Sequence, residues 1–468
     1  MVYCWRNNMF TFMQKFLILV FGIAFLVSPI LVAQPNGPIL VKPEVVGMST
    51  ETLSQLNQII EKHVDDGAIQ GAVVAVSRHE QTVYFEARGF SNLDTQEVLK
   101  SDALFHLASS TKPISGVAAM IAMERGYFKP SDLVEKYIPG FKNIPVAVLD
   151  EPQTRDISPA YVWASPVDND SGFFTRMLDR IWFRFTNGFI LHVPEHRLVP
   201  ADRPITIHDL LTHTAGLAAM GLGTAVADWN KAMLGPNDEV LLHEKTLASF
   251  IDEVASGPLD FQPGTRWMYS GTIGLDVVGR IIEITSGQPY NEFVIENIFD
   301  PLDMRDTYWN IPSDEYPRLL DIPNDKGGWN KTDTSYFSAS IGLASTAKDL
   351  LHFEQMLANR GTFRGRKILD ESSFEMMSAN HVGDLWSKES KGKSAGLGFG
   401  YTVSVVLDPE VAHVPMSRGA LYWAGATGTL TWAEPTTGIA VAIMVQQPNW
   451  ELNREISLAI NASILDRE

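Results

Sequence analysis

The stretch FHLASSTKPISG at residues 105–116 decides how this chain is interpreted. It places Ser109 one helical turn before Lys112, at what the pattern predicts to be the start of a helix. A serine hydroxyl beside a lysine amine is a pairing that suits a nucleophile and its base. The apolar residues 117–123 follow directly, so this helix should be buried and should desolvate the lysine. We therefore predict that Ser109 and Lys112 are catalytic.

The same Ser-x-x-Lys spacing occurs twice more, and context separates these copies from the first. Ser345 and Lys348 open a run with helical apolar spacing, which predicts that Ser345 is an N-cap. Ser390 and Lys393 lie in a polar, glycine-containing stretch without apolar periodicity, which is typical of a solvated loop. Neither context favours catalysis.

The composition indicates a folded protein that is too long for one ordinary hydrophobic core. The chain has 468 residues, 45% of them hydrophobic and 20% charged, so we expect either two domains or one large, elaborated domain. The formal net charge of -18 argues against nucleic acid or an anionic membrane as the main partner, because both reward clustered lysine and arginine. The single cysteine, Cys4, lies close to the N-terminus.

The N-terminus has the three-part pattern of a secretory signal. Arg6 and Lys15 precede an apolar run at residues 16–27, and the small residue Ala33 offers a cleavage site. We expect the segment 1–33 to be a signal peptide and the mature protein to be exported, either periplasmic or secreted. The alternative is an uncleaved segment that contacts the membrane, because the apolar stretch is nearly long enough to span it. Cleavage would remove the only cysteine and with it any thiol chemistry.

Strand-like patterns lie near both ends of the chain, and helical patterns lie between them. Near the start, a helical pattern at 50–64 precedes strand-like runs at 71–77 and 82–86. Near the end, strand-like runs at 398–405, 430–432 and 439–445 precede a last helix at 451–465. The middle of the chain is mostly helical in pattern. This order predicts an α/β protein with one sheet built from both chain ends and an inserted, mostly helical domain.

We expect the α/β domain to comprise residues 34–111 and 331–468 and the helical domain to comprise 112–330, with a cleft at their junction. The segment 173–199 stands out within the helical domain, because its part RMLDRIWFRF is both aromatic and basic. The alternatives for this segment are a lid over the cleft, a dimer contact, a membrane-surface helix, or an extra helix packed on the domain.

Three further stretches support the first one: ITIHDLLTHTAGL at 205–217, FQPGTRWMYSG at 261–271 and YWAGATG at 422–428. Together with SSTK at 109–112, they resemble motifs of the serine β-lactamase and penicillin-binding-protein superfamily. The subgroup to which the chain is most similar is the β-lactamase-like esterases, or family VIII carboxylesterases. The resemblance implies a β-lactamase-like fold, in which helices flank an antiparallel sheet, with the site between two domains.

The resemblance also implies roles for individual residues. Tyr269 corresponds to the tyrosine that relays protons to the leaving group, and the backbone N–H groups of Ser109 and Ala426 would form the oxyanion hole. Gly271 stands where the superfamily usually has an asparagine that binds a substrate amide. In the substrate-binding third motif, Trp423 replaces a lysine or histidine that helps to bind a substrate carboxylate, and it is followed by Ala424 and Gly425. Trp423 offers an apolar wall instead.

These residues favour an exported serine hydrolase that cleaves small to medium carboxylic esters through an acyl-enzyme on Ser109. The alternatives are a β-lactamase or D,D-peptidase of the same fold, and a catalytically silent binding protein. His213 and Asp209 suggest a Ser-His-Asp triad, but the chain has no G-x-S-x-G elbow, so we expect His213 to be structural. No spaced metal-ligand cluster is evident, so we predict neither metal nor cofactor. The sequence leaves the oligomeric state open.

Overall fold

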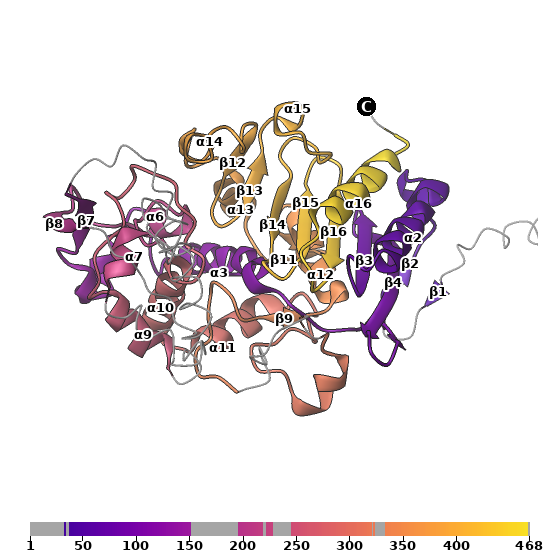
Figure 1. The fold of residues 1–468 in the computed structure, drawn as a ribbon, viewed down its shortest axis with the longest axis horizontal. Coiled ribbons are helices and arrows are strands. Elements are labelled where there is room, and N and C mark those ends of the chain that lie inside the picture. The colour runs from indigo at the N-terminus through magenta and orange to yellow at the C-terminus, as the bar shows by residue number, and fades with distance from the viewer. Residues whose placement is uncertain are drawn as a thin grey trace, which may run out of the picture.

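The computed structural model describes residues 32–33, 37–150, 195–218, 221–227, 245–320, 322 and 333–466. These residues form a 10-stranded sheet in which only the pair β2 and β4 is parallel. In spatial order its strands are β1 (Val32–Ala33), β2 (Ile39–Leu40), β4 (Gln81–Asn92), β3 (Gly71–Arg78), β16 (Ile439–Met444), β15 (Leu430–Glu434), β14 (Leu421–Ala424), β13 (Ser404–Val406) and β12 (Leu397–Phe399), while β5 (Glu97–Val98) pairs with β4. The two ends of the chain meet where β3 pairs with β16 (Figure 1).

Both faces of this sheet are covered, which explains why its central strands are almost entirely apolar. In β3, Val74 and Val76 join a core with α2 (Thr50–Asp65) and α16 (Trp450–Ala462). The alternate residues of the same strand join a second core on the opposite face, where α12 (Ala347–Ala358) packs. Successive side chains of the strand point to opposite faces of the sheet, and they therefore pack in two different cores. The predicted sheet from both chain ends, flanked by helices, is the observed fold.

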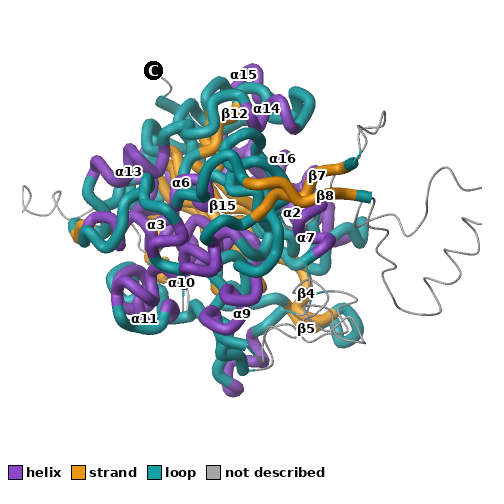
Figure 2. Tube along the Cα trace, turned by 90° about the vertical axis from the view of Figure 1, so that its left-hand side faces the viewer, coloured by secondary structure: helices purple, strands orange, loops and turns teal. Residues whose placement is uncertain are grey.

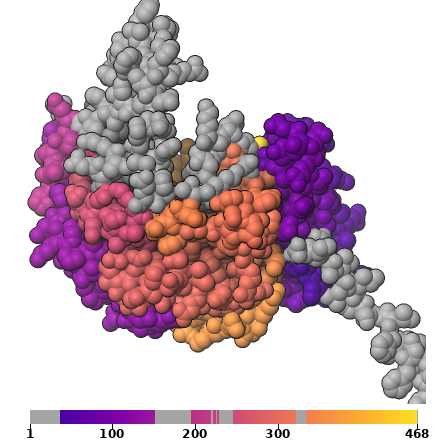
Figure 3. Space-filling model, turned by 90° about the horizontal axis from the view of Figure 1, so that it is seen from below, coloured from indigo at the N-terminus to yellow at the C-terminus, as the bar shows by residue number. Residues whose placement is uncertain are grey.

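The remaining helices gather mainly beside the sheet, as a view from that side shows (Figure 2). They are α3 (Lys112–Glu124), α6 (Ile207–Leu211), α7 (Leu222–Val226), α9 (Leu247–Val254), α10 (Gly274–Ser286), α11 (Tyr290–Val294), α13 (Glu371–Ser378), α14 (Leu385–Glu389) and α15 (Pro409–Ala412). Three two-stranded pairs lie outside the large sheet: β6 (Phe105–His106) with β9 (Ala344–Ser345), β7 (Pro145–Leu149) with β8 (His196–Pro200), and β10 (Thr362–Phe363) with β11 (Arg366–Lys367). From below, the atoms of the middle of the chain, in coral and orange, lie between the purple and magenta atoms on the left and the indigo atoms of the N-terminal part on the right (Figure 3).

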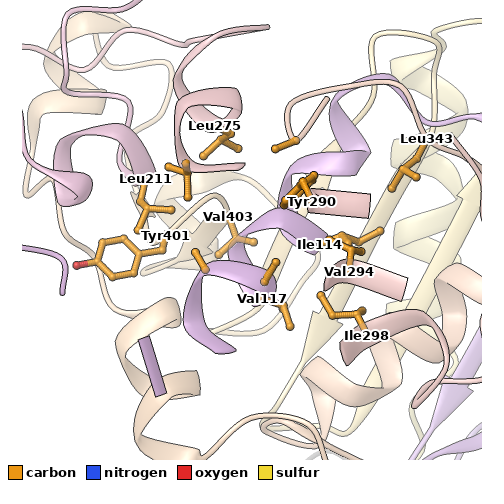
Figure 4. Close-up of a cluster of buried hydrophobic side chains, with 14 of the residues drawn as sticks. Ile114, Val117, Leu211, Leu275, Tyr290, Val294, Ile298, Leu343, Tyr401 and Val403 are labelled. Atoms are coloured by element: carbon orange, nitrogen blue, oxygen red, sulfur yellow. The ribbon is translucent and has the colours of Figure 1, made fainter. Parts of the chain in front are cut away.

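Helix α3 runs through the centre of the molecule and is buried over nearly its whole length. Ile114 and Val117 contact side chains from the helical region and from the loop before β13 (Figure 4). On another side, a Cβ added at Gly116 would lie 2.1 Å from the Thr402 side chain, so only glycine permits this approach. An apolar helix packed on all sides fixes the residues at its N-terminus rigidly.

The expectation of one strand at 398–405 was wrong. The structure divides this segment into β12 and β13, which pair with each other as a hairpin. Thr402 lies in the turn with a φ of 70°, and its N–H donates to Leu211 O. The strand-like pattern of these eight residues did not reveal the left-handed residue that interrupts the strand, because threonine rarely adopts that conformation.

The expectation that Ser345 is an N-cap was also wrong. Ser345 ends β9, where it pairs with Phe105, and its Oγ shares a hydrogen bond of 2.8 Å with Thr307. Thr346 caps α12 instead, because its Oγ accepts from the Asp349 N–H at 3.3 Å. The helix therefore begins one residue later than the sequence pattern suggested.

Two expectations fall largely outside the described residues. The predicted signal peptide does so except for Val32 and Ala33, which form β1. Of the segment 173–199, the structure describes only residues 195–199, and most of these belong to the β7–β8 pair, which the helical pattern did not predict. In the part of the chain that the structure describes, no helix is long and apolar enough to cross a membrane.

Candidate active site

Ser109 lies in a short 3-10 helix, Ala108–Thr111, that leads directly into α3. The preceding residue, Ala108, has a φ of 45°, in the left-handed region that alanine rarely adopts. The Leu107 N–H is fixed by Leu343 O on the neighbouring segment. Backbone strain held by surrounding contacts is characteristic of functional positions, and here it immediately precedes the predicted nucleophile.

Lys112 is the first residue of α3, and none of its surface is exposed. Its Nζ lies 2.6 Å from Gly271 O, 2.9 Å from Ser340 O and 3.4 Å from Ser109 Oγ. A fully buried amine is costly unless its hydrogens are bonded, and the two carbonyl oxygens provide those bonds. The structure thus brings Ser109 and Lys112 together as predicted, and it places Gly271 at the amine through its carbonyl group.

Tyr269 lies on the other side of the lysine, with Lys112 Nζ 5.0 Å from the centre of its ring. The Trp423 indole N–H donates to the Tyr269 hydroxyl oxygen at 3.4 Å. Within the described residues, the Tyr269 hydroxyl and Ser109 Oγ form no direct hydrogen bond. Trp423 is therefore more than an apolar wall, because it also supplies a donor to the tyrosine oxygen.

The turn after β14 packs closely against the backbone that precedes Ser109. A Cβ on Gly425 would lie 2.2 Å from Leu107 O, so this position requires glycine. Thr427 Oγ donates to His106 O at 2.7 Å, which ties the turn to the same backbone. Ala426, between them, is exposed. Among the described residues, no acceptor is seen for the backbone N–H of either Ala426 or Ser109, and their predicted role as an oxyanion hole stays a prediction.

An aromatic cluster, which we did not predict, adjoins Tyr269 and Trp423. Trp267 stacks on Trp386 with 5.0 Å between ring centres, and Phe399 packs edge-on against Trp423 at 5.4 Å. These side chains come from four separate segments of the chain: the loop before α10, α14, β12 and β14. The only sequence signal was the abundance of aromatic residues in each segment, which does not show that they meet.

His213 lies beneath this cluster and does not form a triad. Its Nδ1 accepts from the Ser270 N–H at 3.3 Å, and its carbonyl oxygen accepts from the Met268 N–H at 3.0 Å. Burial, with a smaller contribution from nearby Lys112, holds the pKa of His213 well below its usual range. Asp209 instead pairs with Arg203 at 2.6 Å. The histidine therefore supports the backbone on both sides of Tyr269.

Across the described residues, no group of three or more histidine, cysteine, aspartate or glutamate side chains is placed to hold a metal ion. The reactive groups that the structure brings to this site are the serine hydroxyl and the lysine amine, with the tyrosine beside them. This set is that of a serine hydrolase.

Comparison with known proteins agrees with this class. A family model described as Beta-lactamase matches residues 56–463, and the chain belongs to this family. Protein Rv1367c of Mycobacterium tuberculosis is 28% identical over 427 residues, which cover 86% of this chain and 93% of that protein. Esterase EstB of Burkholderia gladioli is 26% identical over 442 residues, covering 88% and 95%. The protein is a serine hydrolase of the β-lactamase fold, with relatives that resemble the family VIII esterases.

A solved structure shares the fold over most of its length. EstCE1, described as a hydrolase with promiscuous acyltransferase activity, superposes with a TM-score of 0.65 at 22% sequence identity. The match covers 89% of this chain and 99% of that one. At this identity the comparison supports the fold, while the substrate has to be argued from the site.

Proposed function

We propose that this protein hydrolyses small to medium, uncharged carboxylic esters through an acyl-enzyme on Ser109. The observation that carries the proposal is the environment of Lys112. A neutral amine has two N–H bonds and one lone pair, and the carbonyl oxygens of Gly271 and Ser340 take both N–H bonds. The lone pair is left for the Ser109 hydroxyl at 3.4 Å, which is the arrangement that a general base needs.

The reaction would proceed in two stages. In the first, Lys112 accepts the proton of Ser109 while Oγ attacks the ester carbonyl, and the carbonyl oxygen becomes negatively charged. The N–H groups of Ser109 and Ala426 would stabilise that charge. The proton then passes to the leaving alcohol, and we assign that relay to Tyr269, whose ring centre lies 5.0 Å from the amine. In the second stage, water takes the place of the alcohol and releases the acid.

The third motif argues for neutral esters over β-lactams and peptides. Trp423 carries no charge with which to bind a substrate carboxylate, and Gly271 has no side chain to bind a substrate amide. Charge-assisted hydrogen bonds contribute roughly 1.5 to 3 kcal/mol, so their absence costs a charged substrate much of its binding. The aromatic cluster beside Tyr269 suits an apolar group of the substrate. The name of EstB, an esterase, supports the same choice.

Export is a further part of the proposal, and it rests on the sequence of the first 33 residues. Expression of the full chain in a bacterial host, followed by N-terminal sequencing of the exported protein, tests it. A mature N-terminus immediately after Ala33 would support a cleaved signal, and an uncut chain in the membrane fraction would support the anchor.

The substrate class is tested with a panel of nitrophenyl esters and a chromogenic cephalosporin. Wild-type protein should hydrolyse short neutral esters efficiently and the cephalosporin slowly or not at all. Rapid turnover of the cephalosporin with weak activity on every ester would support the β-lactamase alternative. Labelling by a fluorophosphonate probe, which reacts with an activated serine, separates both enzymes from a silent binding protein.

A further inference from the structure

Asp276 is a fully buried carboxylate that the reaction scheme does not use. It lies in the first turn of α10, and its oxygens accept from Tyr336 Oη at 2.5 Å, Ser338 Oγ at 2.9 Å and the Ser340 N–H at 2.8 Å. Among the described residues, no lysine, arginine or histidine forms an ion pair with it. Burial raises the pKa of Asp276, and the three donors oppose that rise. A buried carboxylate without a cation is costly, so its position calls for an explanation.

The hydrogen bonds of Asp276 lead to the catalytic lysine through one peptide unit. Ser338 Oγ donates to Asp276 and accepts from the Ile341 N–H at 3.0 Å. That N–H and the carbonyl of Ser340 belong to the same planar peptide. The Ser340 carbonyl in turn accepts from Lys112 Nζ at 2.9 Å. The chain of bonds therefore runs from the carboxylate through a hydroxyl and a peptide to the amine.

Neighbouring contacts hold the same loop from other sides. Ser115, one turn along α3 from Lys112, donates from its Oγ to Ala339 O at 2.5 Å. The Trp309 indole donates to Ser338 O at 3.0 Å. The bond from Ser115 fixes the loop against α3, and the bond from Trp309 fixes it against a second segment. Within the part of the chain that the structure describes, the bonds to Asp276 and Ser338 are those that set the orientation of the peptide whose oxygen meets the lysine.

We propose that Asp276 is a positioning residue for Lys112. By fixing the Ser340–Ile341 peptide, it directs one N–H of the amine away from Ser109 and leaves the lone pair facing the hydroxyl. The bonds also polarise one another, which makes the Ser340 carbonyl a stronger acceptor than an isolated one. This inference rests on the proposed role of Lys112 as the base.

The chain offers a matched control in Asp260. Its carboxyl group is partly buried, desolvation raises its pKa to about 7, and it accepts from the Ala218 N–H at 2.7 Å and the Thr224 N–H at 2.8 Å. None of these partners contacts Lys112. The substitutions Asp276→Asn and Asp260→Asn thus each replace a hydrogen-bonded carboxyl group, whose pKa desolvation raises, by an amide, and only the first site is connected to the lysine.

The experiment compares wild type, Asp276→Asn and Asp260→Asn in ester hydrolysis and in the rate of fluorophosphonate labelling. Asp276→Asn should lower kcat/KM about 10- to 100-fold, mostly through kcat, because a displaced base costs this much. Asp260→Asn should leave kcat/KM and the labelling rate close to wild type. Thermal unfolding of both variants separates this effect from a loss of folded protein.

The pH profile of ester hydrolysis distinguishes a positioning effect on Lys112 from a general loss of activity. With a neutral amide in place of the carboxylate, the Ser340 carbonyl stabilises a charged amine less, so the midpoint of the acidic limb should move to lower pH. The titratable groups near Asp276 are Tyr336 and Tyr290, and those near Lys112 are Tyr269 and His213. All four are unchanged in the variants, and the midpoint in Asp260→Asn should match that of wild type.

Ser338→Ala provides a second route if Asp276→Asn does not fold. It removes the hydroxyl that joins the carboxylate to the Ile341 N–H, so it should lower the labelling rate and move the pH midpoint in the same direction, by less. Wild-type rates and pH midpoint in Ser338→Ala or in folded Asp276→Asn would overturn the inference, as would equal changes in Asp260→Asn. A wild-type protein that is labelled at Ser109 but hydrolyses no ester would refute the proposed substrate class and leave this inference testable by labelling.

Discussion

Two copies of the Ser-x-x-Lys spacing lie side by side in this fold, because β6, which leads to the first, pairs with β9, which contains the serine of the second. In the first copy, Ser109 lies in a helical turn and Lys112 Nζ reaches to 3.4 Å from its Oγ. In the second, Ser345 ends a strand and bonds to Thr307, while Lys348 is partly exposed. The same spacing therefore gives two different local structures. The serine and the lysine come close to each other only where both lie in one continuous, buried helical turn, as in the first of these two copies.

The largest expected effect comes from removing the two serine hydroxyls in turn. Ser109→Ala should lower ester hydrolysis by several orders of magnitude, because no acyl-enzyme can form. Ser345→Ala removes a hydroxyl that is just as buried, yet it should leave kcat/KM close to wild type. Steady-state kinetics with a nitrophenyl ester measures both. Inactivation of a folded Ser345→Ala protein, with an active Ser109→Ala protein, would reverse the assignment of the nucleophile.

The two lysines should differ almost as much as the serines. Lys112→Met retains an unbranched side chain of similar length but removes the base, so kcat should fall by several orders of magnitude. The carbonyl oxygens of Gly271 and Ser340 would also lose their donor, so some stability should be lost. Lys348→Met, at the partly exposed position, should change neither property appreciably. Unfolding curves measured with the kinetics separate the two effects, and a fully active Lys112→Met would exclude the lysine as base.

The helices that follow the two serines differ in the titratable side chain that they bury, since α3 buries Lys112 and α12 buries Glu354. Glu354 is fully enclosed, and burial raises its pKa to about 8, against the lowering effect of a hydrogen bond with Thr431. The folded protein therefore keeps this proton to higher pH than the unfolded chain, whose glutamate titrates near 4.5. Its contribution to stability is complete below that pH and is lost as the pH rises through about 8.

Glu354→Gln should remove this dependence, because glutamine does not titrate. Between pH 5 and pH 8, the wild type should lose up to about 1.4 kcal/mol per pH unit relative to the variant. Denaturant unfolding at several pH values measures the difference. Asp349, on the same helix, is unchanged in both proteins, so its own titration cancels. Identical pH dependence of the two proteins would show that the Glu354 carboxyl does not hold its proton in the folded state.

These comparisons show which parts of the site the sequence could predict. Ser109 and Lys112 are neighbours on one helix, so local spacing and apolar context were enough to pair them. Tyr269 and Trp423 were assigned through a resemblance, and the indole-to-hydroxyl bond between them is visible only in the structure. Asp276 was not predicted, because it reaches Lys112 through a loop that is 228 residues further along the chain. No local pattern encodes such a contact.

In the fold, as in the site, the features that depend on neighbouring residues were predicted, and those that depend on contacts with distant residues were not. The strands at both chain ends were predicted from their apolar patterns. A strand that is buried on one face alternates apolar and polar residues, and a strand that is buried on both faces is apolar throughout. The break between β12 and β13 was missed because it depends on Thr402, whose left-handed backbone is held by Leu211 O from a different segment. The N-cap of α12 was misplaced by one residue because strand pairing, which no local pattern shows, fixes Ser345 in β9.

The smallest expected effect concerns Trp423, which distinguishes the first Ser-x-x-Lys site from that of a β-lactamase. Trp423→Phe keeps an aromatic wall but removes the N–H that donates to the Tyr269 oxygen at 3.4 Å. A net hydrogen bond contributes about 0.5 to 1.5 kcal/mol, so kcat/KM for a neutral ester should fall about 2- to 12-fold. Trp423→Lys restores a donor to the tyrosine and adds a charge that can bind a carboxylate. This variant should raise the ratio of cephalosporin to ester kcat/KM above that of wild type, and Trp423→Phe should not. If Trp423→Phe is as active as wild type, the indole N–H has no part in catalysis and the tryptophan serves only as a wall. If the lysine variant leaves the ratio unchanged, the lack of a cation is not what excludes β-lactams, and the missing amide at Gly271 becomes the reason to test.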